Sequence, residues 1–294
     1  MKISAVVNTY NEEKNLGRCL ESVKNFAEEI VVVDMHSTDK TVEIAKKYKA
    51  KIFLHEYTRY VEPARNFALS KATGDWILII DADEELPQNL ASKLTKIAKE
   101  NKVDYVQIPR KNIIFGKWIE HSRWWPDYLV RFFKKGRVRF SEEIHQPPQT
   151  EGKGLKLEAE EKNALIHYNF QTIFQFIERL NRYTDIQAEE LFQKGYCFDW
   201  KDLMIQPTNE FLSRFFAGEG YKDGIHGFVL ASLQTFSEFV VYLKLWEKTG
   251  FRDQSITEDF AKTTLKVIHD YLFWLQKITR NSFAKLRLKI KTLI

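Results

Sequence analysis

The feature that most constrains the fold is a regular alternation of short apolar runs with helical patterns over the first 110 residues. The apolar runs are rich in β-branched residues and have strand length, whereas the segments between them repeat apolar residues every three or four positions. Strands that alternate with helices form a mostly parallel sheet with helices on both faces. The sequence therefore predicts an α/β fold. The expected strands are residues 3–8, 30–34, 52–54, 76–80 and 105–108.

The second half of the chain has a different pattern. Residues 110–165 are rich in Trp and Arg and predict site-building loops with short strands, and from about residue 166 the pattern is helical to the end. We therefore expect two domains, an α/β domain at 1–165 and an α-helical domain at 166–294. The glycine-rich segment 218–224 lacks a preceding strand, so we expect it to join helices rather than to bind phosphate.

Cysteine content and hydropathy restrict the cellular setting. Cys19 and Cys197 are far apart and form no CxxC pattern, which argues against a disulfide framework or a structural zinc site and favours a reducing compartment. The N-terminus has no signal-peptide pattern. The most apolar stretch, 227–246, contains Glu238 and Lys244, so we expect a buried or interfacial helix rather than a membrane span. These features predict a cytoplasmic protein.

The net charge of +5 is concentrated at the C-terminus, where residues 260–294 hold eight Lys or Arg and one acid. The rest of the chain is slightly negative and has no nucleic-acid-binding motif, so we expect no nucleic acid partner. In the tail 281–294, Phe283, Leu286 and Ile290 are interleaved with basic residues, a pattern suited to anionic lipid headgroups. A terminal helix packed on the protein explains it equally well, so peripheral attachment to the inner face of the cytoplasmic membrane stays an open expectation.

Acids and amides follow three of the expected strands, at residues 8–12, 34–39 and 81–83. Ligands of open parallel sheets bind beyond the carboxyl ends of the strands, so these side chains belong to the candidate site. Asp81 and Asp83, two residues apart after a buried strand, predict a site for Mg²⁺ or Mn²⁺ that also binds substrate phosphate oxygens. The alternative is a solvated turn before the helix that Pro87 opens.

These segments resemble, in order, the motifs of glycosyltransferase family 2. The matching segments are Asn8-Thr-Tyr-Asn-Glu12, residues 31–41, Arg65-Asn66 and residues 74–84. Later segments resemble the lipopolysaccharide-core β-1,4-glucosyltransferase branch; they are at 109–112, 115–118, 125–127, 131–135, 144–145, 180–183, 221–224, 227–228 and 242–245. The resemblance implies a GT-A fold and an inverting transfer of a hexose, glucose first, from a UDP-sugar to a lipid-linked glycan such as the inner core. Met35 and His36 replace the small residues expected there, and Gln146 replaces a glutamate.

The resemblance also implies roles for individual residues. It places six residues in the donor site: Thr9, Asn11, Glu12, Asp34, Arg65 and Asp81. Asp83 is implied as the stronger metal ligand, Asp81 as a ligand of ribose or of a metal-bound water, and His145 as a further metal ligand or a diphosphate contact. Arg131 is implied to neutralise the leaving diphosphate. A structural histidine and a surface arginine are the alternatives for His145 and Arg65.

An inverting transfer needs a carboxylate that takes the proton of the acceptor hydroxyl. Asp127 follows Trp124 and Trp125, whose rings can stack on sugars and exclude water, so we expect Asp127 to be the base and the two tryptophans to bind the acceptor. Glu142 and Glu143 are the reserve candidates. A simple Pro-Asp turn is the structural alternative.

Other functions stay open at this point. The same chemistry on a peptide or on a polyprenol phosphate is one. A nucleotide-sugar pyrophosphorylase would need a glycine-rich basic loop after the first strand, and this chain has Asn-Thr-Tyr-Asn-Glu there. A non-catalytic scaffold that binds glycans or membranes is disfavoured because Asp34, Arg65, Asp81 and Asp83 are all present.

Overall fold

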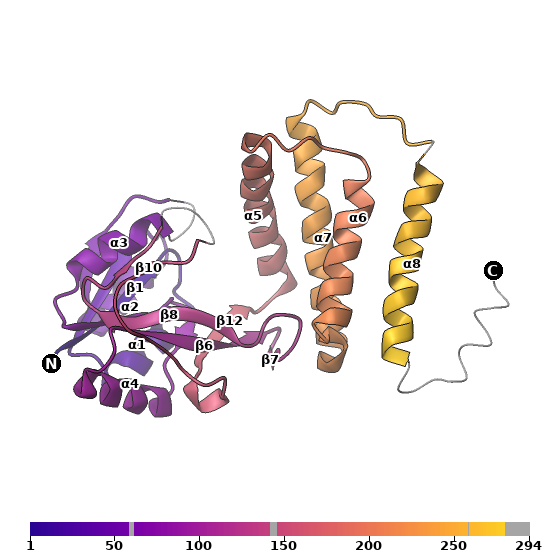
Figure 1. Cartoon of the computed structure of the whole chain (residues 1–294). Helices are drawn as coiled ribbons and strands as arrows, with labels where there is room; N and C mark the ends of the chain where they lie inside the picture. The colour runs from indigo at the N-terminus through magenta and orange to yellow at the C-terminus, as the bar shows by residue number, and fades with distance from the viewer. Residues whose placement is uncertain (59–61, 142–145, 258, 280–294) are drawn as a thin grey trace. The chain divides into compact units, whose positions relative to one another are not determined.

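The computed structural model describes residues 1–58, 62–141, 146–257 and 259–279, and the chain divides into two compact units (Figure 1). The first unit comprises Met1–Ile114 and Trp124–Asn169, and the second comprises Phe115–Arg123 and the chain from Phe170 onward. Each unit is described by itself. The division into an α/β domain at 1–165 and a helical domain at 166–294 stays a prediction.

The first unit is an α/β unit. Its strands are β1 (Ile3–Thr9), β2 (Glu29–Asp34), β3 (Lys51–Leu54), β4 (Trp76–Ile79), β5 (Glu84–Glu85), β6 (Tyr105–Ile114), β8 (Asp127–Lys134), β9 (Val138–Arg139), β10 (Gln149–Thr150), β11 (Gly154–Lys156) and β12 (Leu165–Phe170). Its helices are α1 (Leu16–Val23), α2 (Thr41–Lys47), α3 (Glu62–Lys71), α4 (Gln88–Glu100) and the short η1 (Glu161–Asn163).

The main sheet has the strand order β3-β2-β1-β4-β8-β6-β12-β5. The first four strands are parallel, and β8 then runs antiparallel to both β4 and β6. All five predicted strands are present, and the α/β prediction is confirmed. The sheet is mixed rather than wholly parallel, because β8 follows β6 and returns antiparallel beside it. The last predicted strand continues to Ile114.

Helices cover both faces of this sheet (Figure 1). On one face, Leu20 of α1 and Leu94 of α4 join a buried cluster with β-strand residues such as Val7. On the other, Ala68 and Ala72 of α3 pack against Val6, Ile77 and their neighbours. The β-branched strand residues therefore fill the centre, and the carboxyl ends of β1, β2 and β4 stay at one edge of the sheet.

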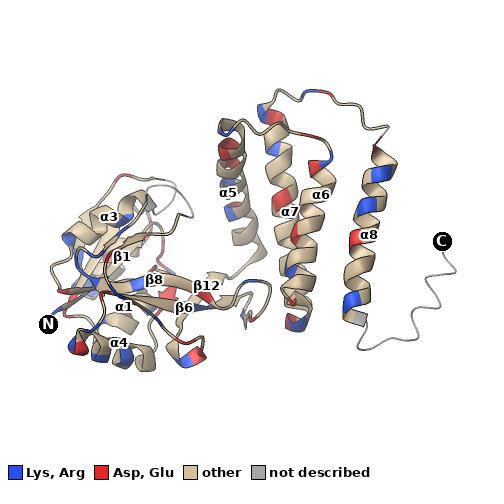
Figure 2. Cartoon of the chain, in the orientation of Figure 1, with Lys and Arg blue, Asp and Glu red and all other residues tan. Residues whose placement is uncertain are grey.

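The second unit is helical. Its elements are β7 (Lys117–Trp118), α5 (Ile173–Gln193), α6 (Asp202–Phe211), the π-helical turn η2 (Leu212–Ala217), η3 (Gly220–Asp223), α7 (Ile225–Lys248) and α8 (Phe260–Thr279). α7 packs against α5 and α6, and α8 packs against α6 and η2. Lysines lie along α8 (Figure 2). Helix was expected from about residue 166 but begins at Ile173, because residues 165–170 pair with β5 as β12.

Among the residues that the structure describes, α7 is the one helix long and apolar enough to cross a membrane. Its most apolar window has a mean hydropathy of 1.3 and is 28% buried. A single helix of this kind is weak evidence for a span, since buried helices of other proteins share its composition. The packing of α7 between α5 and α6 agrees with the expected buried or interfacial helix.

The glycine-rich segment 218–224 holds residues 115–123 within the second unit. The Ser122 N–H donates to the Gly218 carbonyl at 2.7 Å, and the His121 N–H donates to the Asp223 carboxylate at 2.9 Å. The backbone comes close here because side chains are absent. A Cβ atom on Gly227 would lie well inside van der Waals contact of the Gly220 carbonyl oxygen. The expectation that this segment joins helices is confirmed, and it also anchors a distant loop.

This close approach predicts opposite effects of alanine at two helical glycines. Gly227→Ala should lower the free energy of unfolding by about 1–3 kcal/mol, because the new methyl group forces the backbone apart. Gly17→Ala is the control. Its Cβ would lie 3.9 Å from Ile44, so it should raise the free energy of unfolding by about 0.5–1 kcal/mol. Urea denaturation of both variants measures the difference, and equal effects would contradict the close contact.

Candidate active site

The carboxyl ends of three neighbouring strands bring the predicted donor residues to one edge of the sheet. β1 lies between β2 and β4, and Thr9 is the register partner of Asp34. Three buried polar atoms at this edge have no hydrogen-bond partner among the described residues, namely Asn8 Oδ1, Thr9 Oγ1 and Arg65 Nη1. Buried polar atoms are rarely left unpaired, so they mark a place where a polar ligand would bind.

The loops after β1 and β2 are tied together by their side chains. The carboxylate of Asp34 accepts hydrogen bonds from the Ser37 N–H at 2.9 Å and the Ser37 hydroxyl at 2.5 Å, and Asn11 Oδ1 accepts from the Thr38 N–H at 2.8 Å. The Glu12 carboxylate accepts from a side-chain amide three residues later. Asp34 thus shapes its own loop. Each carboxylate oxygen can accept a second hydrogen bond, so the predicted contacts of Asp34 and Glu12 with a nucleoside stay predictions.

A cluster of charged groups lies directly after β4. Arg65 Nη2 donates to Asp81 Oδ1 at 3.0 Å, and the Arg131 guanidinium pairs with Asp81 and, at 2.9 Å, with Glu84 Oε1. Glu84 is fully buried and Arg131 is 2% exposed. Burial by itself raises the pKa of Asp81, but the positive charges of Arg131 and Arg65 outweigh burial and hold that pKa well below its usual range. Asp81 is therefore ionised at neutral pH and pairs with two arginines.

A bulge in β8 directs Arg131 toward this cluster. Phe132 pairs with Val106 and Val130 with Gln107, so Arg131 is the extra residue between them. The buried guanidinium faces Asp81 and Glu84 and holds these two carboxylates. The predicted contact of Arg131 with a leaving diphosphate stays a prediction. Two guanidinium groups pair with Asp81, whose role as a metal ligand also stays a prediction.

Asp127 opens β8 opposite Arg110 of β6, its register partner. The Asp127 Oδ2 atom accepts from Arg110 Nε at 2.9 Å, from Arg110 Nη2 at 2.5 Å and from Asn112 Nδ2 at 3.3 Å. The carboxylate is 28% exposed. Since all three described donors reach Oδ2, the other oxygen, Oδ1, is the one available to a substrate.

His167 of β12 connects Asn112 with Asp83. Its Nδ1 lies 2.7 Å from Asn112 Oδ1, and its Nε2 lies 3.4 Å from Asp83 Oδ2. Asn112 Nδ2 donates to the Trp124 carbonyl and to Asp127, so the amide orientation is fixed with Oδ1 toward the histidine. Nδ1 must then carry the hydrogen, and Nε2 faces a carboxylate oxygen. Two acceptor atoms at this distance need a proton or a cation between them.

Asp83 and His167 are therefore the described residues best suited to hold a divalent cation. Neighbouring ligands of octahedral Mg²⁺ lie about 3 Å apart, close to the observed separation, and imidazole and carboxylate both serve such ions. No group of three or more His, Cys, Asp or Glu forms a metal cluster within the described part of the chain. The predicted ligand His145 and the reserve bases Glu142 and Glu143 lie outside the described residues.

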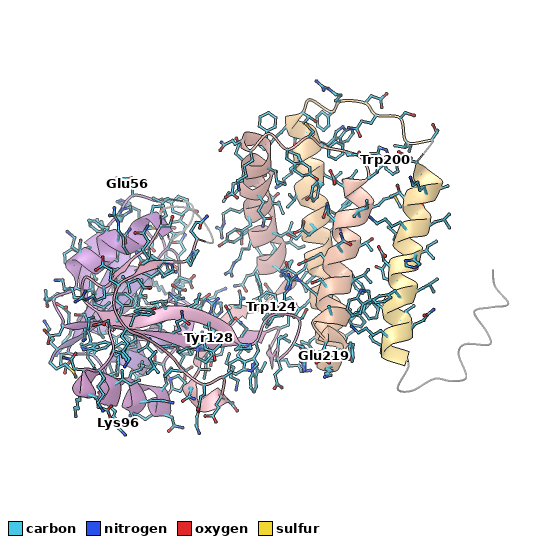
Figure 3. All side chains as sticks on the ribbon, in the orientation of Figure 1. Glu56, Lys96, Trp124, Tyr128, Trp200 and Glu219 are labelled. Atoms are coloured by element: carbon cyan, nitrogen blue, oxygen red, sulfur yellow. The ribbon has the colours of Figure 1, made fainter. Side chains whose placement is uncertain are left out.

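Trp124 and Trp125 are half-buried and are separated from Asp127 by Pro126. Figure 3 labels Trp124. The Trp124 carbonyl accepts from Asn112 Nδ2 at 2.8 Å, which fixes the backbone next to the candidate base. The structure thus brings the tryptophans and Asp127 together, as the sequence predicts. Binding of an acceptor by their rings stays a prediction.

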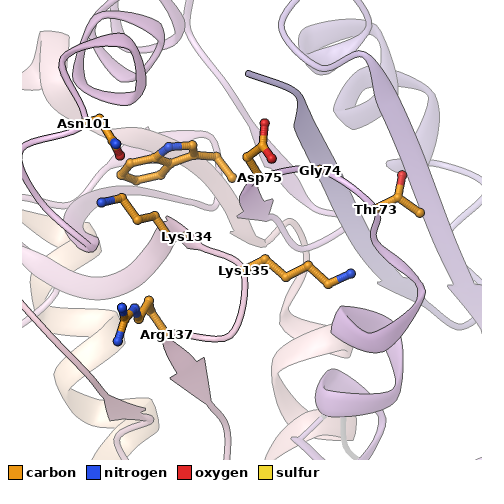
Figure 4. A pocket seen from close by; sticks show the side chains of 8 residues that line it. Thr73, Gly74, Asp75, Asn101, Lys134, Lys135 and Arg137 are labelled. Carbon is orange, nitrogen blue, oxygen red and sulfur yellow. The ribbon is translucent and has the colours of Figure 1, made fainter.

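A second hollow lies at the opposite end of β4 (Figure 4). It is lined by Thr73, Gly74, Asp75, Trp76, Asn101, Lys134, Lys135 and Arg137. Because residues 73–76 precede or begin β4 whereas Asp81 follows it, this hollow is not part of the candidate active site. Lys134 is already paired with Asp104 at 3.1 Å.

Sequence reasoning assigned no role to four residues of this network: Glu84, Arg110, Asn112 and His167. One signal was present. Arg110 and Asn112 stand two residues apart on the same face of a strand as buried Ile108 and Ile114. Polar side chains at alternate positions of an otherwise apolar strand face indicate a buried polar network.

The charged cluster predicts a specific loss of stability. Arg131→Met should lower the free energy of unfolding by about 3–5 kcal/mol at pH 7, because it leaves buried carboxylates without their partner. The depressed pKa of Asp81 stabilises the fold above the usual pKa of about 4, and this stabilisation is lost as the pH falls below that value. The variant should therefore lose less stability than the wild type on acidification.

Denaturant midpoints at pH 7 and at about pH 3 test both statements. The exposed Arg137, which lies 3.7 Å from Glu151, provides the control variant Arg137→Met, expected to change stability by less than about 0.5 kcal/mol. Equal losses in the two variants would contradict the role given to Arg131.

The chain is similar to known glycosyltransferases in sequence. An uncharacterized glycosyltransferase of Rickettsia typhi is 32% identical, over 97% of this chain and 99% of its own. The lipopolysaccharide core biosynthesis glycosyltransferase LpsC of Rhizobium meliloti is 24% identical, over 88% of this chain and 97% of its own. The solved structure of Staphylococcus aureus TarS residues 1–349 is similar with a TM-score of 0.43 and 17% identity, over 87% of this chain and 95% of that one.

The family model also matches. It describes "Glycosyl transferase family 2" and covers residues 4–152, which include β1 to β4, the charged cluster and Asp127. The parallel half-sheet with its acidic strand ends and the antiparallel return of β8 form a GT-A-like sheet with flanking helices. The chain belongs to glycosyl transferase family 2 and is a glycosyltransferase.

Proposed function

We propose that this glycosyltransferase is inverting and metal-dependent. It moves a hexose, with glucose as the favoured sugar, from a UDP-sugar to a hydroxyl of a lipid-linked glycan such as the lipopolysaccharide inner core. The observation that carries the proposal is the chain Asp83–His167–Asn112–Asp127, in which Asn112 hydrogen-bonds to His167 and Asp127, and His167 Nε2 lies 3.4 Å from Asp83 Oδ2. It joins a candidate cation site to a candidate base. A transferase of this kind needs both, one for the departing diphosphate and one for the attacking hydroxyl.

On the donor side, Asp83 and His167 would hold Mg²⁺ or Mn²⁺. When bound, the cation would supply positive charge that stabilises the leaving diphosphate. The unpaired Asn8 Oδ1, Thr9 Oγ1 and Arg65 Nη1 supply polar contacts for the nucleotide at the same edge of the sheet. The motif resemblance, rather than any contact described above, favours UDP and glucose.

On the acceptor side, the hydroxyl would attack the anomeric carbon from the face opposite the diphosphate. Asp127 Oδ1 would take its proton, while Arg110 and Asn112 hold Oδ2 in place. Positioned general bases of this kind contribute about 10²–10⁴-fold to rate. The half-buried Trp124 and Trp125 would exclude water from this side and pack on a sugar ring.

The acceptor class is supported by the similarity to LpsC, whose name places it in lipopolysaccharide core biosynthesis. A lipid-linked acceptor would require work at a membrane surface. The tail 281–294, which lies outside the described residues, is the segment proposed from its sequence for peripheral contact with the inner face of the cytoplasmic membrane. Peptide and polyprenol-phosphate acceptors are the alternatives within the same chemistry.

Donor binding tests the cation site. Calorimetric titration with UDP should show binding that strengthens at least tenfold with Mn²⁺, and Asp83→Ala and His167→Ala should each remove that gain. Asp75→Ala, at the opposite end of β4, is the control and should bind like the wild type. No nucleotide binding under any condition would overturn the proposal in favour of a non-catalytic scaffold.

Asp127→Asn tests the base. The amide keeps the shape of the side chain but cannot take a proton, so transfer should fall by at least about 100-fold while UDP binding is retained. Radiolabelled hexose transfer to extracted lipid-linked glycans provides the measurement. Near-normal turnover in this variant would remove Asp127 from the role.

A further inference from the structure

α8 is an edge helix of the second unit. Contacts order the long helices as α5, α7, α6 and α8, so that α8 packs on α6 and η2 along one side (Figure 1). Tyr271 and Trp274 on that side lie 6.0 Å and 6.3 Å, between ring centroids, from Phe211 and Phe216. Thr263 is 6% exposed on the same side. The inner face of α8 is therefore accounted for by ordinary packing.

The outer face of α8 is apolar. Leu265, Ile268 and Leu275 are 66%, 45% and 42% exposed, and Leu272 lies between them in the same stripe. The spacing of three, four and three residues places the four side chains in one line along the helix. Phe273, beside this line, is 55% exposed. Single exposed apolar residues need no explanation, but a continuous stripe of large ones indicates a binding surface.

Positive charge lies on one side of the stripe. Lys262 and Lys266 are exposed and lie about 60° and about 100° around the helix from Leu265. The single acid of the helix, Asp270, is 3.5 Å from its neighbour His269. The sequence continues from Arg280 with five further Lys or Arg and no acid. A second copy of this helix would bring lysines against lysines, which disfavours self-association through this face. An anionic surface with an apolar layer beneath it complements both features.

We propose that the outer face of α8 binds an anionic lipid bilayer, with Leu265, Ile268, Leu272 and Leu275 in the boundary between headgroups and acyl chains. Lys262 and Lys266, on the adjoining side of the helix, contact lipid phosphates. The inference extends the proposed function, on which it rests for its purpose, because this attachment holds the enzyme at the surface where a lipid-linked acceptor resides. It differs from the tail proposal, since the binding residues belong to a helix packed within the second unit.

Co-sedimentation with vesicles tests the proposal. The full chain should bind vesicles of equal parts phosphatidylglycerol and phosphatidylcholine, and binding should weaken in high salt and with pure phosphatidylcholine. Leu265→Gln/Ile268→Gln should reduce binding at least tenfold, and Lys262→Gln/Lys266→Gln should remove most of its salt dependence. The control is Phe174→Gln/Ile177→Gln on α5, where the side chains are 75% and 39% exposed; it should bind like the wild type.

Three outcomes would overturn the inference. Full binding by the Leu265→Gln/Ile268→Gln variant, with loss in a chain ending at residue 280, would assign the membrane contact to the tail alone. An equal loss of vesicle binding in the α5 control would indicate non-specific binding through any exposed apolar residues. A concentration-dependent dimer in light scattering that the stripe variant abolishes, without vesicle binding, would identify a second copy as the occupant. UDP titration of the same variants separates this test from the proposed function. Loss of UDP binding would count against the proposed function, whereas loss of vesicle binding alone concerns only the surface of α8.

Discussion

The structure of the first unit depends on keeping a group of acids charged at the buried end of β4. Glu84 is fully buried, and isolating such a carboxylate from water costs several kcal/mol unless cations and hydrogen bonds compensate. Arg131 of β8 and Arg110 of β6 provide that compensation. The acidic residues after β4 therefore depend on β6 and β8, because these strands carry the two arginines that neutralise the buried carboxylate of Glu84.

This dependence explains which parts of the site the sequence could predict. Asp34, Asp81 and Asp83 follow strands whose direction is evident from local pattern, so their shared edge was predictable. Arg131 and His167 reach the site only through pairings made late in the chain. A one-residue bulge decides where Arg131 points, and a strand read as helix decides where His167 lies. Local periodicity contains no information about either event.

The second unit shows the same limit. The helical pattern from about residue 166 and the apolar stretch 227–246 predicted helices in this part of the chain, because both are local properties of the sequence. Nothing local indicates that residues 115–123 belong with these helices. That follows from Asp223, whose carboxylate accepts two backbone N–H groups of the segment, and from the side-chain-free surface at Gly218 and Gly220. The glycines of the segment 218–224 are thus explained by close backbone packing rather than by phosphate binding.

The chain from Asp83 to Asp127 restricts the chemistry further than any single residue does. Asn112 has one acceptor and one amino group, and the structure uses both, so its orientation is determined by hydrogen-bonding capacity alone. That orientation determines which nitrogen of His167 carries hydrogen, which in turn presents an acceptor to Asp83. At the other end it fixes Asp127 Oδ2 and leaves Oδ1 to substrate. The orientation of one buried amide thus bears on both ends of the chain: the contact between His167 and Asp83, and the carboxylate oxygen of Asp127 that is left for a substrate.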